Sequence, residues 1–235
     1  PTPLLCKTDK TQPLNTRDYE KSIVSDGHLP EKLRDVPLRG GVVGGVRLSG
    51  ARGEVCGGGG AVGCGESGGR WIVWGQSGSG KSTFAVQLCR ELSRFGKVLY
   101  DSLEEGTSLT FRNKIAQLQD VERGRFQVVS EPIEALKERL AKRRSADFVI
   151  IDSFQYTGLD YRSYLALKQT LASKLLILIS HADGKLPSGR AAKSVMYDAS
   201  LKIWVEGYRA YSKGRFIGEN GGVYTIWDEG AQIIG

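Results

Sequence analysis

Residues 75–82 read Gly-Gln-Ser-Gly-Ser-Gly-Lys-Ser, and this stretch decides the fold of the chain. It matches the pattern G-x-x-x-x-G-K-[ST], follows the apolar run 71–74 and precedes a segment with helical spacing of apolar residues. Glycines let such a loop curl so that its N–H groups point at a phosphate chain, and a helix N-terminus favours an anion. A chance Gly/Ser-rich turn would lack this strand–loop–helix context, so the stretch is a predicted P-loop.

Two side chains of the predicted P-loop have expected roles in nucleotide binding. Lys81 would reach the β- and γ-phosphates of ATP, and the Ser82 hydroxyl would bind Mg²⁺. Lys81 therefore counts as both a binding and a catalytic residue. The residues expected to hold the nucleotide are Gly75, Gln76, Ser77, Gly78, Ser79, Gly80, Lys81, Ser82 and Thr83.

Outward from the P-loop, apolar runs alternate with segments of helical periodicity. Strands are expected at 71–74, 98–100, 126–129, 148–151 and 175–179, and helices at 81–95, 107–119, 131–144 and 161–173. This alternation is typical of an α/β fold with a parallel sheet flanked by helices. After residue 198 the helices are expected to stop. Three further strands, at 199–205, 208–212 and 223–227, are expected to extend the sheet as antiparallel edge strands.

Residues 1–69 differ from the remainder of the chain. Five of the seven prolines precede residue 40, and residues 40–69 contain 14 glycines. Such a segment loses much backbone entropy on folding and offers few side chains to bury. We therefore expect a flexible N-terminal segment over 1–69 and one folded domain over 70–235.

The charge and cysteine content narrow the class of protein. A net charge of +7 and a basic stretch at 185–215 suggest a polyanionic partner, although a solvated basic surface is an equal alternative. No apolar run is long enough for a membrane span and no signal-peptide core is present. The four cysteines form no CxxC pair, so we expect no zinc site. Nothing in the cysteine pattern requires an oxidising compartment, so we expect a cytoplasmic location.

Acidic residues follow two of the predicted strands. Asp152 ends the strand at 148–151 and is expected to help hold magnesium beside Ser82; its alternative role is to cap a turn. Glu104 and Glu105 follow the strand at 98–100, where one of them would prepare the attacking water. The residues leave open which glutamate acts, and whether both are solvated residues at the start of a helix.

Three other side chains have possible catalytic roles. His181 follows the strand at 175–179 and could contact the γ-phosphate, or it could be an ordinary loop histidine. Lys213 and Arg215 lie two residues apart, so on a strand they would point to the same side. They could clamp a phosphate, including one bound by a neighbouring subunit, or form an exposed basic edge strand.

Taken together, residues 70–230 resemble the RecA-like ATPases of the RadA/KaiC/DnaB branch. The similarity rests on the P-loop, the S-x-E-E pattern at 102–105, the segment 178–181 and the K-x-R-F element at 213–216. It implies a catalytic glutamate, and a Lys–Arg pair that completes the ATP site of the adjacent protomer in a ring or filament. The chain lacks the branch's zinc ribbon and protease-like domain, and its glycine after K-x-R-F comes one residue late.

The resemblance further implies binding of DNA by the loops at 154–162 and 183–193. Cations for phosphates and aromatic rings for bases suit single-stranded DNA. The expected function is Mg-ATP hydrolysis coupled to DNA binding in recombination, repair or replication. The alternative is an ATP-gated assembly or partner-binding protein with negligible turnover; a kinase or a GTPase fits the motifs less well. The residues expected to contact DNA are Tyr156, Arg162, Lys185, Arg190 and Lys193.

Overall fold

The computed structural model describes residues 42–43, 46–48, 55–57, 69–106, 108, 111, 113, 115, 121, 124–214 and 222–233. Within the N-terminal part, three short strands, β1 (Val42–Val43), β2 (Val46–Leu48) and β3 (Val55–Gly57), pair in antiparallel order. The other residues of 1–68 lie outside the described part, so the flexible segment expected there stays a prediction.

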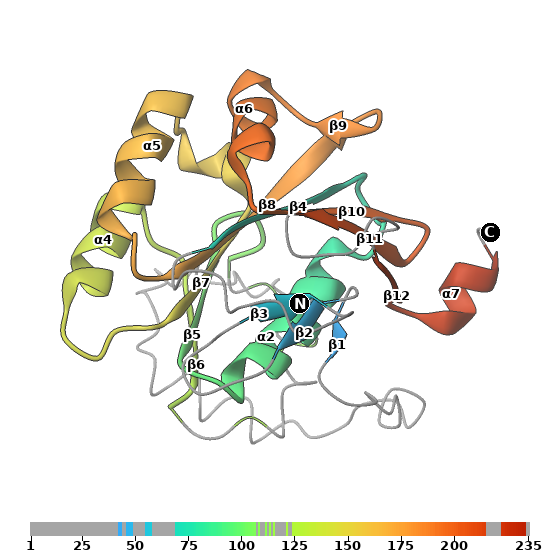
Figure 1. The fold of residues 1–235 in the computed structure, drawn as a ribbon, viewed down its shortest axis with the longest axis horizontal. Helices are drawn as coiled ribbons and strands as arrows, with labels where there is room; N and C mark the ends of the chain where they lie inside the picture. The colour runs from blue at the N-terminus through green and yellow to red at the C-terminus, as the bar shows by residue number, and fades with distance from the viewer. Residues whose placement is uncertain are drawn as a thin grey trace, which may run out of the picture.

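A nine-stranded sheet forms the centre of the molecule, with strand order β12-β11-β10-β4-β8-β7-β5-β6 and β9 paired to β8 (Figure 1). In the order above, the strands from β10 to β6 pair in parallel with their neighbours. Strand β11 pairs antiparallel with β10 on one side and with β12 on the other. The α/β sheet with antiparallel C-terminal strands is thereby confirmed. Its bounds are β4 (Arg70–Gly75), β5 (Val98–Ser102), β6 (Phe126–Val129), β7 (Phe148–Asp152), β8 (Leu175–Asp183), β9 (Leu186–Pro187), β10 (Leu201–Glu206), β11 (Arg209–Gly214) and β12 (Gly222–Thr225).

Helices cover both faces of this sheet (Figure 1). Helix α2 (Lys81–Ser93) lies on one face, and α4 (Ile133–Ala141), α5 (Tyr161–Thr170) and α6 (Arg190–Asp198) lie on the other. Two apolar cores result, one between α2 and the sheet and the other beneath α4, α5 and α6. Every residue of β4, β5 and β7 is buried, as expected for parallel strands with both faces covered.

Helices α2, α4 and α5 agree closely with the ranges predicted at 81–95, 131–144 and 161–173, whereas α6 was not predicted. Of the helix predicted at 107–119, Phe111, Asn113 and Ile115 are helical and most other residues lie outside the described part. Cys89 is fully buried in α2, as a small core residue would be.

The C-terminal part departs from the sequence prediction in two elements. Strand β10 pairs parallel to β4 and lies inside the sheet, so the expectation of an antiparallel edge strand at 199–205 is wrong. Helix α7 (Asp228–Ile233) follows β12, so the expectation that helices stop after residue 198 is wrong. Two acidic residues, Asp228 and Glu229, occupy its first turn, where negative charge suits the helix dipole. The helix is held by packing of Gly230 against Trp227, since a Cβ at Gly230 would lie 2.2 Å from the indole ring. Helix α7 has only six residues, one of them a glycine, and so short a segment shows no helical pattern in the sequence.

The two segments expected as loops also contain secondary structure. A short 3-10 helix, η3 (Phe154–Thr157), lies within 154–162, and β9 with the first turn of α6 lies within 183–193. In the part of the chain that the structure describes, no helix has the length and apolar character needed to cross a membrane.

Candidate functional site

The loop between β4 and α2 is shaped by three glycines. A Cβ at Gly75 would lie 2.2 Å from the carbonyl oxygen of Val205, so only glycine fits where β4 passes β10. Gly78 and Gly80 have φ values of 76° and 101°, which L residues with side chains rarely adopt. Gly80 is also the N-cap of α2, so no side chain caps the first turn of this helix. Its N–H groups are thus available to an anion.

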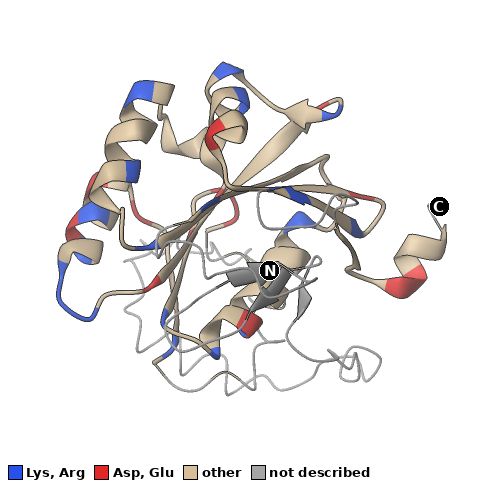
Figure 2. Cartoon of the chain, in the orientation of Figure 1, with Lys and Arg blue, Asp and Glu red and all other residues tan. Residues whose placement is uncertain are grey.

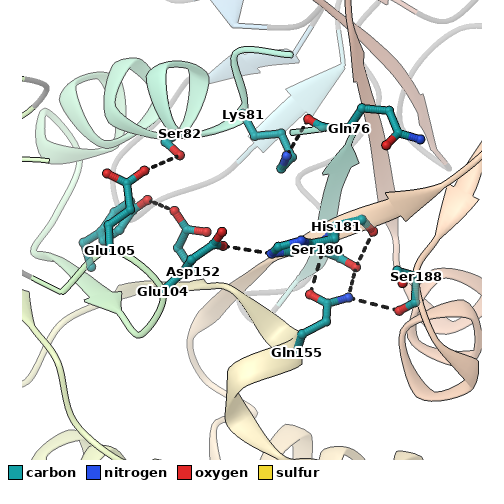
Figure 3. Close-up of polar contacts among 11 residues, drawn as sticks. Gln76, Lys81, Ser82, Glu104, Glu105, Asp152, Gln155, Ser180, His181 and Ser188 are labelled. Carbon is teal, nitrogen blue, oxygen red and sulfur yellow. Dashed lines mark hydrogen bonds and ion pairs between the residues drawn. The ribbon is translucent and has the colours of Figure 1, made fainter. Parts of the chain in front are cut away.

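Lys81 folds back over this loop. Its Nζ donates a hydrogen bond of 2.7 Å to the carbonyl oxygen of Gln76, and the N–H of Ser79 donates to the same oxygen at 3.2 Å. The ammonium group therefore lies over the curled backbone (Figure 3). A phosphate chain placed in the loop would meet backbone N–H groups and this cation, so the loop fits the phosphates of a nucleotide.

Asp152 is the last residue of β7, and β8 lies between β7 and the P-loop strand β4. It pairs in register with Ser102 of β5 and Ile179 of β8, and its carboxylate accepts a hydrogen bond from the hydroxyl of Tyr100. Burial raises the pKa of Asp152 to about 6; the Tyr100 hydrogen bond opposes this shift and the carboxylates of Glu104 and Glu105 add to it. The peptide bond from Asp152 to Ser153 is cis.

Glu104 and Glu105 lie in the turn after β5, and this turn is fixed to the end of β7. The N–H groups of Leu103 and Glu104 donate to the carbonyl oxygen of Asp152 at 2.7 and 3.1 Å. Glu105 Oε1 lies 3.4 Å from Ser82 Oγ, and Glu104 Oε2 lies 2.9 Å from His181 Nε2 (Figure 3). The two glutamates thus have different partners, one on the P-loop helix and one on β8.

Gln155 holds the backbone around His181 and was not predicted from the sequence. Its Oε1 accepts from the N–H of His181 at 3.2 Å, and its Nε2 donates to Ser180 Oγ at 2.7 Å and to the Ser188 carbonyl oxygen at 3.0 Å (Figure 3). The ring of Tyr156 lies near the ring of His181, with 6.3 Å between the two ring centroids. The one sequence signal for Gln155 is its position three residues after Asp152, at the end of a predicted strand. This position predicts contacts with Ser180 and His181 only if β7 and β8 are known to be neighbours.

A magnesium ion fits this group of oxygen atoms only in part. Ser82 Oγ and the carboxylates of Asp152 and Glu105 converge beside the P-loop, and oxygen is the ligand that Mg²⁺ prefers. Among the described residues, no group of three or more His, Cys, Asp or Glu side chains is arranged to hold a metal ion. Phosphate oxygens would therefore have to complete the coordination, as is usual for Mg²⁺.

Lys213 does not belong to the site of its own chain. It is exposed on β11 and faces Lys202 of β10 in register, which in turn pairs with Ile72 near the start of β4. The P-loop follows the other end of β4, at Gly75. Arg215, its predicted partner, lies outside the described residues.

The residues expected to contact DNA lie at one edge of the sheet. Tyr156 is 58% exposed in η3, Arg162 is exposed in the first turn of α5, and Lys185 is exposed between β8 and β9. Arg190 is exposed at the start of α6, and Lys193 Nζ lies 3.9 Å from Asp183 Oδ2 on β8.

Comparisons with known proteins agree with this geometry. A sequence profile described as an AAA domain matches residues 66–183, half of the chain. Flagellar accessory protein FlaH from Methanocaldococcus jannaschii is similar in structure, with a TM-score of 0.50 and 19% identity over 68% of this chain and 83% of that one. KaiC-like protein PH0186 from Pyrococcus horikoshii OT3 gives a TM-score of 0.51 and 20% identity over 67% and 84%. These likenesses show a RecA-like P-loop fold. No curated protein matches the sequence.

Proposed function

The chain belongs to the AAA domain family of P-loop proteins, and we propose that it is a magnesium-dependent ATPase of the RecA-like type. One observation supports this most: the side chains of Lys81, Ser82, Asp152, Glu104 and His181 converge at the same edge of the sheet, although four separate segments of the chain carry them. In open parallel sheets this carboxyl edge is where ligands bind.

The residues of the chain have distinct roles in this proposal. The loop amides and Lys81 hold the phosphates, and Ser82 and Asp152 hold the metal. Magnesium, when bound with the nucleotide, neutralises the charge that develops on the transferred phosphoryl group. Asp152 is kept in place by Tyr100 and by the turn bonded to its carbonyl oxygen.

Glu104 is the proposed base that orients and deprotonates the attacking water. It is partly exposed and paired with His181 on β8, whereas Glu105 contacts the metal-binding Ser82. A base has to lie beyond the terminal phosphate, and a group beside Ser82 is better placed to contact the waters of the metal. We therefore assign Glu105 to the metal side of the site.

A decisive measurement is phosphate release from ATP with and without Mg²⁺, on the full chain. Wild type should hydrolyse ATP only with Mg²⁺, and Lys81→Ala should lower the rate about 100-fold or more, because the variant loses the cation over the phosphates. Full turnover by Lys81→Ala would refute the site. Nucleotide binding by wild type without Mg²⁺-dependent release would instead favour the ATP-gated binding protein.

The proposal includes assembly of several copies. Lys213 is exposed on β11, away from its own P-loop, so it is available to the site of a neighbouring copy together with Arg215. ATPase rate per chain should then rise steeply with protein concentration. Mixing Lys213→Ala chains with Glu104→Gln chains should recover part of the activity; recovery of none would oppose the shared site.

Single-stranded DNA is the proposed partner of the loops at 154–162 and 183–193. Exposed Tyr156 lies against His181, which gives DNA bound there a direct route to the residues that face the phosphate. DNA should stimulate hydrolysis, less so at high salt. Reversing Lys185 and Arg190 to Glu should remove the stimulation. The matched control reverses Lys142 and Arg143, which are exposed at the opposite edge; equal loss in both variants would contradict these loops as the binding site.

A further inference from the structure

Two aromatic side chains with no role in the proposed hydrolysis lie beside the P-loop: Tyr208 contacts the loop, and Trp227 contacts Tyr208. Tyr208, in the turn between β10 and β11, donates its N–H to the Ser79 carbonyl oxygen at 3.2 Å. Its ring is close enough that a Cβ at Gly80 would lie 3.0 Å from Tyr208 Cδ1. The Trp227 ring meets Tyr208 edge to face, with centroids 5.0 Å apart. Trp227 is nonetheless 40% exposed, which is unusual for so large an apolar ring.

The pair is held rigidly in this position. The N–H of Ile226 donates to the carbonyl oxygen of Tyr208 at 2.8 Å, and the main chain of α7 lies against the indole ring at Gly230. Arg209 Nη2 donates to the Ala231 carbonyl oxygen at 2.9 Å and fixes the end of α7 to β11. Helix α7 therefore supports one part of the Trp227 ring and leaves another part open to solvent.

The direction of the bound nucleotide follows from the order of the strands. Asp152, Glu104 and His181, which are proposed to act at the terminal phosphate, come from β7, the turn after β5, and β8, on one side of β4. The opposite end of the nucleotide must then leave the P-loop on the other side of β4, where β10 and β11 carry Tyr208. In a nucleotide, the sugar ring lies between the base and the phosphates. In the protein, the Tyr208 ring lies between Trp227 and Gly80 of the P-loop, so Trp227 lies at a distance from the loop that suits the base.

We infer that Tyr208 and Trp227 form a platform on which the nucleobase stacks. This inference rests on the proposed nucleotide binding and extends it to the choice of base. An aromatic ring recognises the face of a base and tolerates any base, because each has a π-face. The amide side chain of Gln87 on α2 already donates to the Ile226 carbonyl oxygen and accepts from the Tyr224 hydroxyl. The site should therefore take purine nucleoside triphosphates by stacking, with little distinction between ATP and GTP.

Calorimetric titration with Mg-ATP, Mg-GTP and Mg-tripolyphosphate tests this platform, since tripolyphosphate lacks a base. Wild type should bind ATP and GTP within about threefold of each other and more tightly than tripolyphosphate. Trp227→Ala should weaken ATP and GTP about fivefold or more, because stacking is worth about 1–3 kcal/mol per base, and leave tripolyphosphate unchanged. Trp227→Phe, which retains an aromatic face, should keep most of the affinity.

Two controls separate the platform from the P-loop and from folding. Ile233→Ala, at a 79% exposed position of α7, should change none of the three affinities, whereas Lys81→Ala should weaken all of them. The platform is refuted if Trp227→Ala binds ATP like wild type, if ATP and tripolyphosphate weaken together, or if wild type prefers ATP over GTP by 100-fold. Failure of wild type to bind any of the three ligands would refute the proposed function as well.

Discussion

The two edges of the parallel sheet have different chemistry. At the carboxyl edge, α2 begins with uncapped N–H groups, and the side chains that surround them include Asp152, Glu104 and Glu105. At the amino edge, helices end, and Lys and Arg donate to their last carbonyl groups. Arg70 donates to the carbonyl oxygens of Lys168 at 2.7 Å and Leu171 at 3.1 Å, near the end of α5.

Before two other strands at the amino edge, lysines donate to carbonyl groups in the segment that follows α4. Lys97 Nζ donates to the Arg144 carbonyl oxygen at 3.0 Å, and Lys174 Nζ donates to that of Ala146 at 2.6 Å. Figure 2 shows the basic loop that follows α4 at this edge. Strand direction thus separates two environments. At the amino edge, cations bind the carbonyl groups of a helix end and of the segment after α4. At the carboxyl edge, helix amides and carboxylates suit a metal-bound phosphate.

The largest effect should come from Glu104→Gln at the carboxyl edge. Loss of the proposed base should lower kcat about 100- to 10,000-fold and leave ATP binding intact. Glu105→Gln is the matched control and should mainly raise the Mg²⁺ concentration needed for half-maximal rate. Steady-state kinetics with varied Mg²⁺ would distinguish the two, and the reverse ranking would exchange their roles.

Gly75→Ala should destabilise the fold by about 3 kcal/mol, because the new Cβ would lie 2.2 Å from the Val205 carbonyl oxygen and 2.7 Å from Ser79 Oγ. Gly78→Ala has no atom within 4 Å of its Cβ and should cost about 1–2 kcal/mol from its positive φ alone. Urea denaturation measures both. Equal losses would mean that the contact between β4 and β10 adds nothing.

At the amino edge, Arg70→Met should lower the unfolding free energy by about 2 kcal/mol, because the carbonyl oxygens of Lys168, Leu171 and Lys174 lose their donor. Affinity for nucleotide should not change, since this edge is remote from the P-loop. Arg143→Met, at an exposed position, should shift stability by less than about 0.5 kcal/mol. A change in nucleotide affinity with Arg70→Met would argue against the separation of the two edges.

The smallest effect concerns Asp101, which is fully buried on β5 and faces Glu131 and Arg139. Burial raises the pKa of Asp101 from 3.8 to about 7. Between these values the folded chain keeps a proton that the unfolded chain has lost, so stability from this group falls as pH rises from about 4 to 7. Asp101→Asn should therefore gain stability relative to wild type between pH 6 and pH 8, by about 1 kcal/mol. Parallel pH profiles from chemical denaturation would refute this.

The sequence placed the P-loop, Asp152, the glutamate pair and His181 at one edge of the sheet, where the structure brings their side chains together; their roles stay predictions. Each follows a recognisable strand, and parallel strands place their carboxyl ends at one edge. Gln155 and Tyr208 could not be predicted in this way, because their roles depend on contacts between segments 25 or more residues apart, with Ser180 and with Ser79. The parallel pairing of β10 with β4 is likewise a property of the assembled sheet.

The hydrogen bond between Tyr208 and Ser79 has a mechanical consequence. Tension applied at the C-terminal helix would pass through Arg209 and the Trp227–Tyr208 contact into the turn before β11, and from there directly onto the main chain of the phosphate loop. A tether or neighbour that pulls on this end of the molecule would therefore load the phosphate loop through Tyr208.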